Sequence, residues 1–216
     1  MDRIAFIRAN SRLLSPPLVP EIRLHLAEES LPIWQKTEEE LGQLNLPPPF
    51  WAFAWAGGQA LARYVLDNAS LVTAKRVLDL GAGSGLTAIA AAKAGAAHVV
   101  GADIDEFAFA AIGMNAAANG ISVEARTDDL LDAAPDAFDV VIVGDMFYER
   151  ELAARTMAFI DKAEAQGARV LVGDPQRSYF PAHRFAKLAD YRVPVSRELE
   201  DGEIKNTAVW RLKNAA

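Results

Sequence analysis

Short apolar runs and helical segments alternate along most of the chain. Runs typical of buried parallel strands occupy residues 77–80, 97–102, 121–126, 138–143 and 168–172. Segments with helical periodicity lie between them at 84–95, 106–119 and 149–165. We also expect a helix over 180–190, and a hairpin in which 191–199 pairs with 205–212 across Asp201-Gly202. This alternation predicts an α/β fold, a mainly parallel sheet with helices on both faces.

The first part of the chain has a different pattern, because prolines interrupt it repeatedly. Proline occupies positions 16, 17, 20, 32 and 47–49, where it forbids a long helix. Between them, 33–44 is predicted to be helical, with charged residues on its solvent-facing side. We therefore divide the chain into a Pro-rich extension, residues 1–49, and a main domain, residues 50–216. The extension is expected to cover the mouth of the sheet as a lid, and the alternative for residues 1–18 is a frayed terminus.

A glycine-rich turn follows the strand at 77–80. Gly81, Gly83 and Gly85 allow a tight turn and the close approach of a ligand to the backbone, and a helix begins directly after them. The spacing is G-x-G-x-G rather than the G-x-G-x-x-G of dinucleotide-binding folds. Asp79 adds a carboxylate that disfavours a pyrophosphate and suits a ligand with an ammonium group. S-adenosylmethionine has such a group, together with a sulfonium.

Further acidic residues stand at the ends of the other predicted strands. The carboxyl ends of parallel strands share one edge of the sheet, so these side chains are expected to converge, although each aspartate is also a good helix N-cap. Asp103 is placed to accept hydrogen bonds from both ribose hydroxyls of a nucleoside, and Ile104 offers an apolar edge to the adenine. Asp129, or less favourably Asp128, is the candidate acceptor for the adenine amino group. Asp145 ends the fourth strand, and Asp174 follows the fifth.

An aromatic cluster, residues 50–55, precedes a second pair of glycines and an apolar helix through Leu61 and Val65. One interpretation is that the aromatic side chains anchor the extension to the core. The other is that residues 55–59 border the cofactor, since adjacent glycines before a helix expose the backbone. On the second interpretation Trp55, Gly57 and Gln59 are cofactor-binding residues.

Composition narrows the functional classes. The 216 residues carry a formal net charge of −7 without a Lys/Arg cluster, which disfavours a nucleic-acid partner and favours a basic one. Cysteine is absent and the three histidines are scattered, so neither a disulfide nor a metal site is expected. No apolar run is long enough for a membrane span, and no secretory signal is evident. We expect a monomer in the cytoplasm, or in the mitochondrial matrix if the source is eukaryotic.

The motif Asp79-x-Gly81-x-Gly83-x-Gly85, followed by Asp103 and the acidic end of the third strand, resembles the class I S-adenosylmethionine-dependent methyltransferases. That resemblance covers roughly residues 50–212 and implies a Rossmann-like seven-stranded sheet whose last strand is antiparallel. Members that methylate amides or adenine carry Asn/Asp-Pro-Pro-Tyr after the fourth strand. This chain has Asp145-Met146-Phe147-Tyr148, which is similar to the protein lysine methyltransferases. In that group Asp145 would also contact the cofactor and, as the catalytic carboxylate, would orient the lysine amine, and Tyr148 would wall its channel.

Three segments narrow the resemblance further. Residues 55–59, 144–148 and 173–177 resemble the electron transfer flavoprotein β-subunit lysine methyltransferases, as does the Pro-rich lead-in 46–55. The resemblance implies methylation of lysines beside the docking loop of that flavoprotein subunit. Gln176 departs from the pattern, because glycine is expected there, and this leaves the role of the loop containing Gln176 and Arg177 open.

Other functions are compatible with the same residues. A ribosomal protein or a small amine could be the methyl acceptor. An NAD-dependent oxidoreductase could use the same fold, since the spacing from Gly81 to Asp103 also suits NAD. A non-catalytic module that binds S-adenosylmethionine is the third class.

Overall fold

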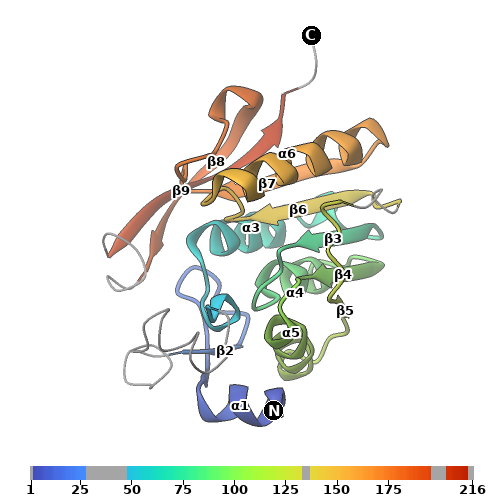
Figure 1. Ribbon diagram of the computed structural model, residues 1–216. Coiled ribbons are helices and arrows are strands. Elements are labelled where there is room, and N and C mark those ends of the chain that lie inside the picture. Colours follow the sequence, from blue (N-terminus) through green and yellow to red (C-terminus); the bar gives the residue numbers. More distant parts are fainter. Residues whose placement is uncertain (1, 28–47, 133–136, 196–202, 214–216) are drawn as a thin grey trace.

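The structure is a computed structural model that describes residues 2–27, 48–132, 137–195 and 203–213. Within these residues the main feature is a seven-stranded sheet with the order β5-β4-β3-β6-β7-β9-β8 (Figure 1). The strands are β3 (Arg76–Leu80), β4 (His98–Ala102), β5 (Glu124–Arg126), β6 (Val140–Gly144), β7 (Arg169–Asp174), β8 (Phe185–Pro194) and β9 (Ile204–Leu212). Strands β5, β4, β3, β6 and β7 are parallel, whereas β9 runs antiparallel to both β7 and β8. The predicted sheet with an antiparallel last strand is confirmed.

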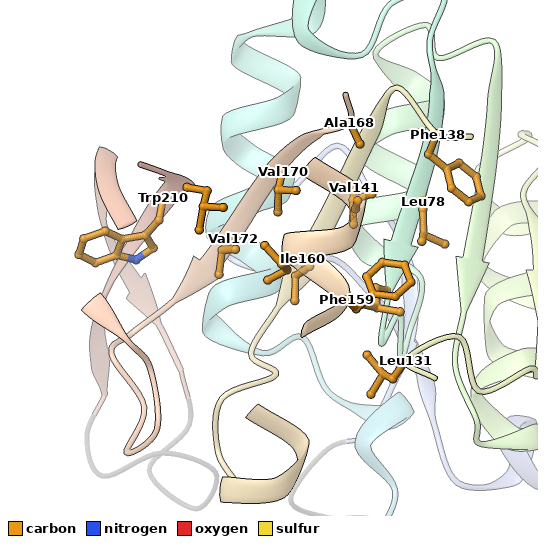
Figure 2. Close-up of a cluster of buried hydrophobic side chains, with 14 of the residues drawn as sticks. Leu78, Leu131, Phe138, Val141, Phe159, Ile160, Ala168, Val170, Val172 and Trp210 are labelled. Atoms are coloured by element: carbon orange, nitrogen blue, oxygen red, sulfur yellow. The ribbon is translucent and has the colours of Figure 1, made fainter. Parts of the chain in front are cut away.

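Helices cover both faces of the sheet, as predicted. The helices are α3 (Ala56–Asp67), α4 (Leu86–Lys93), α5 (Glu106–Ala118) and α6 (Arg150–Ala165). Alternate residues of each central strand point to opposite faces. Leu78, Val141 and Val170 therefore pack on α6, where Phe159 and Ile160 meet them (Figure 2).

The neighbouring strand residues face the other side of the sheet. Val77, Ile142 and Leu171 pack against the apolar sides of α3 and α4. Because both faces are covered, the central strands β3, β4, β6 and β7 are mostly apolar, and their carboxyl ends form one edge.

The described part of the extension packs closely against the main domain. It contains α1 (Arg3–Ala9) and an antiparallel pair formed by β1 (Arg12–Leu14) and β2 (Leu24–Leu26). Ile7 is fully buried in a cluster with Phe107 of α5, and Ile22 is fully buried in a cluster with Leu86 of α4. Residues 3–26 are therefore a folded part of the molecule rather than a frayed end. The predicted helix at 33–44 lies outside the described residues, and the lid stays a prediction.

The predicted helix at 180–190 is wrong. A single 3-10 turn at Ala182–Arg184 leads into β8, which pairs with β9 from Phe185 to Pro194 with one irregularity between Lys187 and Ala189. Ala186, Lys187 and Leu188 favour a helix locally, but β8 is an edge strand whose conformation is set by its hydrogen bonds to β9. Its start at Phe185 also buries an aromatic ring against the core. The predicted hairpin with 205–212 is confirmed for residues 191–194. Its partner strand begins earlier than expected, at Phe185, and residues 196–199 of the prediction lie outside the described residues.

Two further 3-10 turns, Phe50–Ala52 and Ala69–Leu71, flank α3. None of the helices in the described ranges is long and apolar enough to cross a membrane.

Candidate active site

The predicted glycine turn lies between β3 and α4, with all three glycines at positive φ. The φ angles of Gly81, Gly83 and Gly85 are 67°, 50° and 77°, a region that side-chain-bearing residues rarely adopt. A Cβ atom on Gly81 would also overlap the sulfur of Met146. The turn therefore needs glycine for backbone conformation, and at Gly81 also for the close approach of the β6 loop.

Asp79 lies beneath the turn and is 1% exposed. Its Oδ2 accepts the backbone N–H of Ala88 at 2.8 Å, and the Thr87 hydroxyl donates a further hydrogen bond. Burial raises the pKa of its carboxyl to about 7, against the lowering effect of these hydrogen bonds. Asp79 is thus tied to the first turn of α4 and does not reach the surface of the cavity described below. Its assignment to the ammonium group of the cofactor stays a prediction.

Asp103 stands at the end of β4 and faces the turn. Its Oδ2 accepts the backbone N–H of Gly83 at 2.8 Å, and its Oδ1 accepts that of Asp105 at 3.0 Å. Burial raises the pKa of the Asp103 carboxyl, while these two hydrogen bonds oppose the shift. Next to it, the side chain of Ile104 is 70% exposed on the cavity wall. The structure brings both residues beside the turn, as predicted.

Asp129 lies on the third side of the same cavity. Its Oδ2 accepts a 2.8 Å hydrogen bond from Arg155 of α6, and its Oδ1 accepts the N–H of Leu131 at 3.1 Å. The Arg155 hydrogen bond is the largest cause of a lowered pKa for this carboxyl, which remains an ionised acceptor. Asp128 also lines the cavity.

A single cavity of about 510 Å³ joins these residues to the ends of β6 and β7. Its lining includes Gly81, Gly83, Asp103, Ile104, Asp129, Asp145, Tyr148, Trp55, Phe50 and Arg177. Gly57, Gln59, Asp79 and Gly85 do not line it. A larger and more open hollow of about 700 Å³ lies at the opposite ends of β6 and β7, around Asp139 and Arg169. Ligands of parallel α/β sheets bind at the carboxyl ends of the strands, so the smaller cavity is the candidate active site.

Asp145 occupies the inner part of this cavity, where β6 ends. Its φ is +58°, a strained conformation for a residue with a side chain, of the kind that occurs at functional sites. The residue is 8% exposed. Its Oδ2 accepts the N–H of Gly58 at 2.9 Å, and its Oδ1 accepts two hydrogen bonds from Arg177, at 3.0 Å from Nε and 2.6 Å from a terminal nitrogen. The carboxylate is thus held between the first turn of α3 and the loop after β7.

The glycine pair before α3 has a packing role. A Cβ on Gly57 would overlap the carbonyl oxygen of Gly173 and lie 2.6 Å from Asp145 Oδ2. A Cβ on Gly173 would likewise overlap the carbonyl oxygen of Gly57. Only two glycines let α3 approach the end of β7 closely enough for Gly58 to bond Asp145. Gly57 therefore supports the site from behind.

Gln59 is 2% exposed and also acts through the backbone. Its Oε1 accepts the N–H of Leu18 at 3.3 Å, and its Nε2 donates to the carbonyl of Ala54 at 2.7 Å. It joins the extension to the aromatic cluster, so both interpretations of residues 50–59 hold for different residues. Trp55 lines the cavity, whereas Gln59 anchors the chain around it.

Aromatic side chains form another part of the cavity wall. The ring centroids of Phe50 and Trp55 are 5.9 Å apart, and those of Phe50 and Tyr148 are 5.7 Å apart. The Trp55 indole N–H donates to the Phe50 carbonyl at 3.1 Å, which fixes the ring. Tyr148 remains 46% exposed, and partial burial raises the pKa of its hydroxyl. The cavity therefore offers an apolar, π-rich approach to Asp145.

The sequence interpretation missed the role of Arg177. Its guanidinium carbon lies 5.7 Å from the centre of the Trp55 ring, and it forms the ion pair with Asp145. Its backbone N–H donates to Asp174 Oδ1 at 2.7 Å. Asp174 is fully buried, and burial is the main reason that its pKa rises to about 7. The motif 173–177 marked this loop, but no local pattern indicates that Arg177 reaches Asp145.

Across 2–27, 48–132, 137–195 and 203–213, no group of three potential ligand side chains is arranged to hold a metal ion.

Comparison with known proteins relates this chain to methyltransferases. Residues 59–146 match the family model of ribosomal protein L11 methyltransferase (PrmA). The solved structures with similar folds include Thermoplasma acidophilum 1320 (TM-score 0.56, 20% identity, 73% of this chain and 90% of that chain). They also include magnesium protoporphyrin IX methyltransferase from Synechocystis PCC 6803 with bound SAM (TM-score 0.55, 17% identity, 84% of this chain and 88% of that chain). At these identities the likeness concerns the fold.

Curated relatives are more similar. The electron transfer flavoprotein beta subunit lysine methyltransferase of Rattus norvegicus is 37% identical over 213 residues, which cover 95% of this chain and 82% of the relative. The protein of the same name from Homo sapiens is 36% identical over 213 residues, covering 95% and 80%. The chain belongs to the family of electron transfer flavoprotein beta subunit lysine methyltransferases.

Proposed function

We propose that this protein transfers methyl groups from S-adenosylmethionine to lysine side chains of the electron transfer flavoprotein β-subunit. The observation that carries the proposal is the position of Asp145. It places a buried carboxylate in the same cavity as the glycine turn, at the end of an aromatic approach.

The residues around the turn fit the cofactor. The backbone of Gly81 and Gly83 is open to a ligand, Asp103 presents a carboxylate suited to ribose hydroxyls, and Ile104 offers an apolar edge. Asp129 adds an acceptor for the adenine amino group. When bound, S-adenosylmethionine supplies an electrophilic methyl group on its sulfonium, which a neutral amine nitrogen can take by in-line displacement.

The other half of the cavity fits a lysine side chain. Phe50, Trp55 and Tyr148 would surround its aliphatic part and exclude water, and their π-faces also accommodate methylated ammonium groups. Asp145 would accept a hydrogen bond from the amine and hold it in line with the methyl group, which is catalysis by positioning. The proton that the amine must lose would pass to Asp145 or to solvent.

The substrate assignment rests on the relatives and on charge. The relatives are named for the electron transfer flavoprotein beta subunit, and they align over 95% of this chain. The net charge of −7 suits a lysine-rich docking surface, since complementary charge speeds association. Ribosomal protein L11 is the second candidate, because the PrmA family model matches residues 59–146.

Incubation with methyl-labelled S-adenosylmethionine and each purified candidate substrate tests the proposal. We expect label on lysines of the flavoprotein β-subunit, located by peptide mass spectrometry, and none on L11. Asp145→Asn is the matched control, because it keeps the size of the side chain and the bond from Gly58. Equal labelling by this variant would disprove the role of Asp145, and labelling of L11 alone would replace the substrate.

A further inference from the structure

The Asp145–Arg177 ion pair occupies the place where the cavity would receive the target amine. The side chains of Asp145 and Arg177 are only 10% and 16% exposed, and both line the cavity. The guanidinium also lies over the Trp55 ring at 5.7 Å. A carboxylate beside an aromatic face is the environment that recognises an organic cation. In this structure the cation is part of the enzyme itself.

We propose that Arg177 is a displaceable placeholder, which the ammonium group of the target lysine replaces on Asp145 over the face of Trp55. This inference rests on the proposed function, because it takes a lysine side chain as the ligand of that cavity.

The distribution of hydrogen bonds over the two carboxylate oxygens supports displacement. Oδ2 is held by the backbone N–H of Gly58 at 2.9 Å and faces α3. Oδ1 accepts both Arg177 donors, at 2.6 and 3.0 Å, which fills the acceptor positions of one carboxylate oxygen. An incoming ammonium can therefore reach Oδ1 only if the guanidinium leaves. The carboxylate itself stays in place, because Gly58 holds the other oxygen.

Charge balance favours a direct exchange of one cation for another. A carboxylate buried as deeply as Asp145 is strongly destabilised when it loses its partner. Replacing the guanidinium by a lysine ammonium would keep a cation on Asp145 throughout. The placeholder would thus maintain an ionised, correctly oriented Asp145 until a substrate arrives.

The loop that carries Arg177 allows this movement without refolding. The Arg177 backbone is fixed by the 2.7 Å bond to Asp174, whereas its side chain is anchored in the cavity by contacts with Asp145 and Trp55. Ser178 and Tyr179, which follow it, are exposed at the surface. Rotation of the side chain toward solvent would therefore free the cavity while the loop keeps its hydrogen bonds.

A cation-binding experiment tests the placeholder without any protein substrate. Ethylguanidinium is titrated into the wild-type protein, Arg177→Ala and Arg177→Ala/Asp145→Asn at constant ionic strength, with tryptophan fluorescence and calorimetry as readouts. We expect Arg177→Ala to bind the probe at least about tenfold more tightly than the wild type, and the double variant to lose this gain. Affinity for S-adenosylmethionine is measured in parallel to establish that each variant is folded, and Arg177→Met replaces Arg177→Ala if the latter fails to fold.

Steady-state kinetics supply the second arm. Removal of a competing cation is expected to lower the KM for the protein substrate by about threefold to tenfold and to leave kcat within about threefold. Two results would overturn the proposal. One is a folded Arg177→Ala variant that gains no affinity for ethylguanidinium. The other is a collapse of kcat at saturating substrate that added ethylguanidinium restores, because Arg177 would then be required during turnover. If the flavoprotein subunit is not the substrate, the ethylguanidinium titration still tests whether a cation can replace Arg177 on Asp145.

Discussion

The two halves of the cavity are built in different ways. The half that we propose for the cofactor, here the cofactor half, comprises the glycine turn and the ends of β3 and β4, where Asp79 bonds Ala88 nine residues away and Asp103 bonds Gly83 twenty residues away. The half that we propose for the lysine, here the substrate half, comprises the ends of β6 and β7 with the start of α3. Its central contact joins Gly58 to Asp145 across 87 residues. Apart from Asp129, the first half is formed by one βαβ unit, whereas the second depends on the assembly of the whole sheet.

This difference in construction predicts which half of the cavity tolerates substitutions better. Local turns form wherever their glycines permit the required φ angles, and the neighbouring strand completes them. The substrate half instead requires three separate segments to meet within hydrogen-bonding distance. We therefore expect substitutions that separate those segments to have the largest effects on activity, with little change in the cofactor half.

Gly57→Ala should have the largest effect. The added Cβ would overlap the Gly173 carbonyl, and a backbone group cannot move aside cheaply. We expect a loss of about 3 kcal/mol in the free energy of unfolding, measured by chemical denaturation. Methyl transfer should fall by at least about 100-fold, because a displaced α3 no longer positions Asp145.

Gly58→Ala is the matched control, one residue along the same helix. Its Cβ would have the Leu86 side chain as nearest neighbour at 4.0 Å, and the N–H to Asp145 is retained. Alanine in the first turn of a helix should be neutral or stabilising by up to about 1 kcal/mol. If both variants lost the same stability, the close contact between Gly57 and Gly173 would not be what limits the packing of α3.

Asp103→Asn and Asp145→Asn should affect different steps, because one carboxylate lies in the cofactor half and the other in the substrate half. Loss of the carboxylate that we propose to bind the ribose is expected to weaken S-adenosylmethionine binding by about tenfold, while kcat at saturating cofactor changes little. Asp145→Asn should show the reverse, with cofactor affinity retained and kcat reduced by about 100-fold. Calorimetry of cofactor binding and initial rates measure the two effects. A parallel loss of affinity in both variants would indicate that the cavity does not divide in this way.

The same division describes what the sequence can reveal. The sequence predicts that Asp103 and Ile104 lie beside the glycine turn, as the structure has them, because a strand, a turn and a helix N-terminus have local signatures. The role of Arg177 and the contact between Gly57 and Gly173 are not predicted, because nothing in a local pattern records which distant segments meet. The wrong helix at 180–190 has the same cause: β8 is specified by its partner β9 rather than by its own residues.

One buried carboxylate in each half should make stability depend on pH. The pKa values of Asp79 and Asp174 are raised to about 7 from 3.8, so the folded protein binds more protons than the unfolded chain between these values. The stability contributed by the protonated forms is complete below the unfolded pKa and is lost as pH rises through about 7. We expect the free energy of unfolding to fall between about pH 4 and pH 7, by at most about 1.4 kcal/mol per pH unit for each group.

Denaturation curves of Asp79→Asn and Asp174→Asn across that pH range measure how much each carboxylate contributes to the pH dependence of stability. Each variant should show a shallower decline than the wild type, because one of the two titrating groups is removed. A stability that rises with pH over this interval would mean that both carboxylates are ionised more readily than their burial indicates.

Gln176 provides the smallest and most local test of the substrate half. Its φ is +64°, which costs a residue with a side chain about 1 kcal/mol and glycine almost nothing. Gln176 therefore stands where glycine is expected from the resemblance and where the backbone conformation also favours glycine. Gln176→Gly should raise the free energy of unfolding by up to about 1 kcal/mol, since relief of strain outweighs the greater entropy of the unfolded chain.

Gln166→Gly controls for the substitution itself. Gln166 caps α6 with φ at −88°, where glycine relieves no strain and only increases the entropy of the unfolded chain, so this variant should lose about 0.5–1 kcal/mol. Opposite signs for the two changes, measured by thermal and chemical denaturation, would establish that the loop after β7 is strained. If Gln176→Gly also lowered the KM of the protein substrate, the strain would be helping to hold Arg177 against Asp145. An unchanged KM would mean that the strain at Gln176 affects only the stability of the protein. The position of Arg177 would then be determined by its contacts, which include Asp145, Asp174 and Trp55.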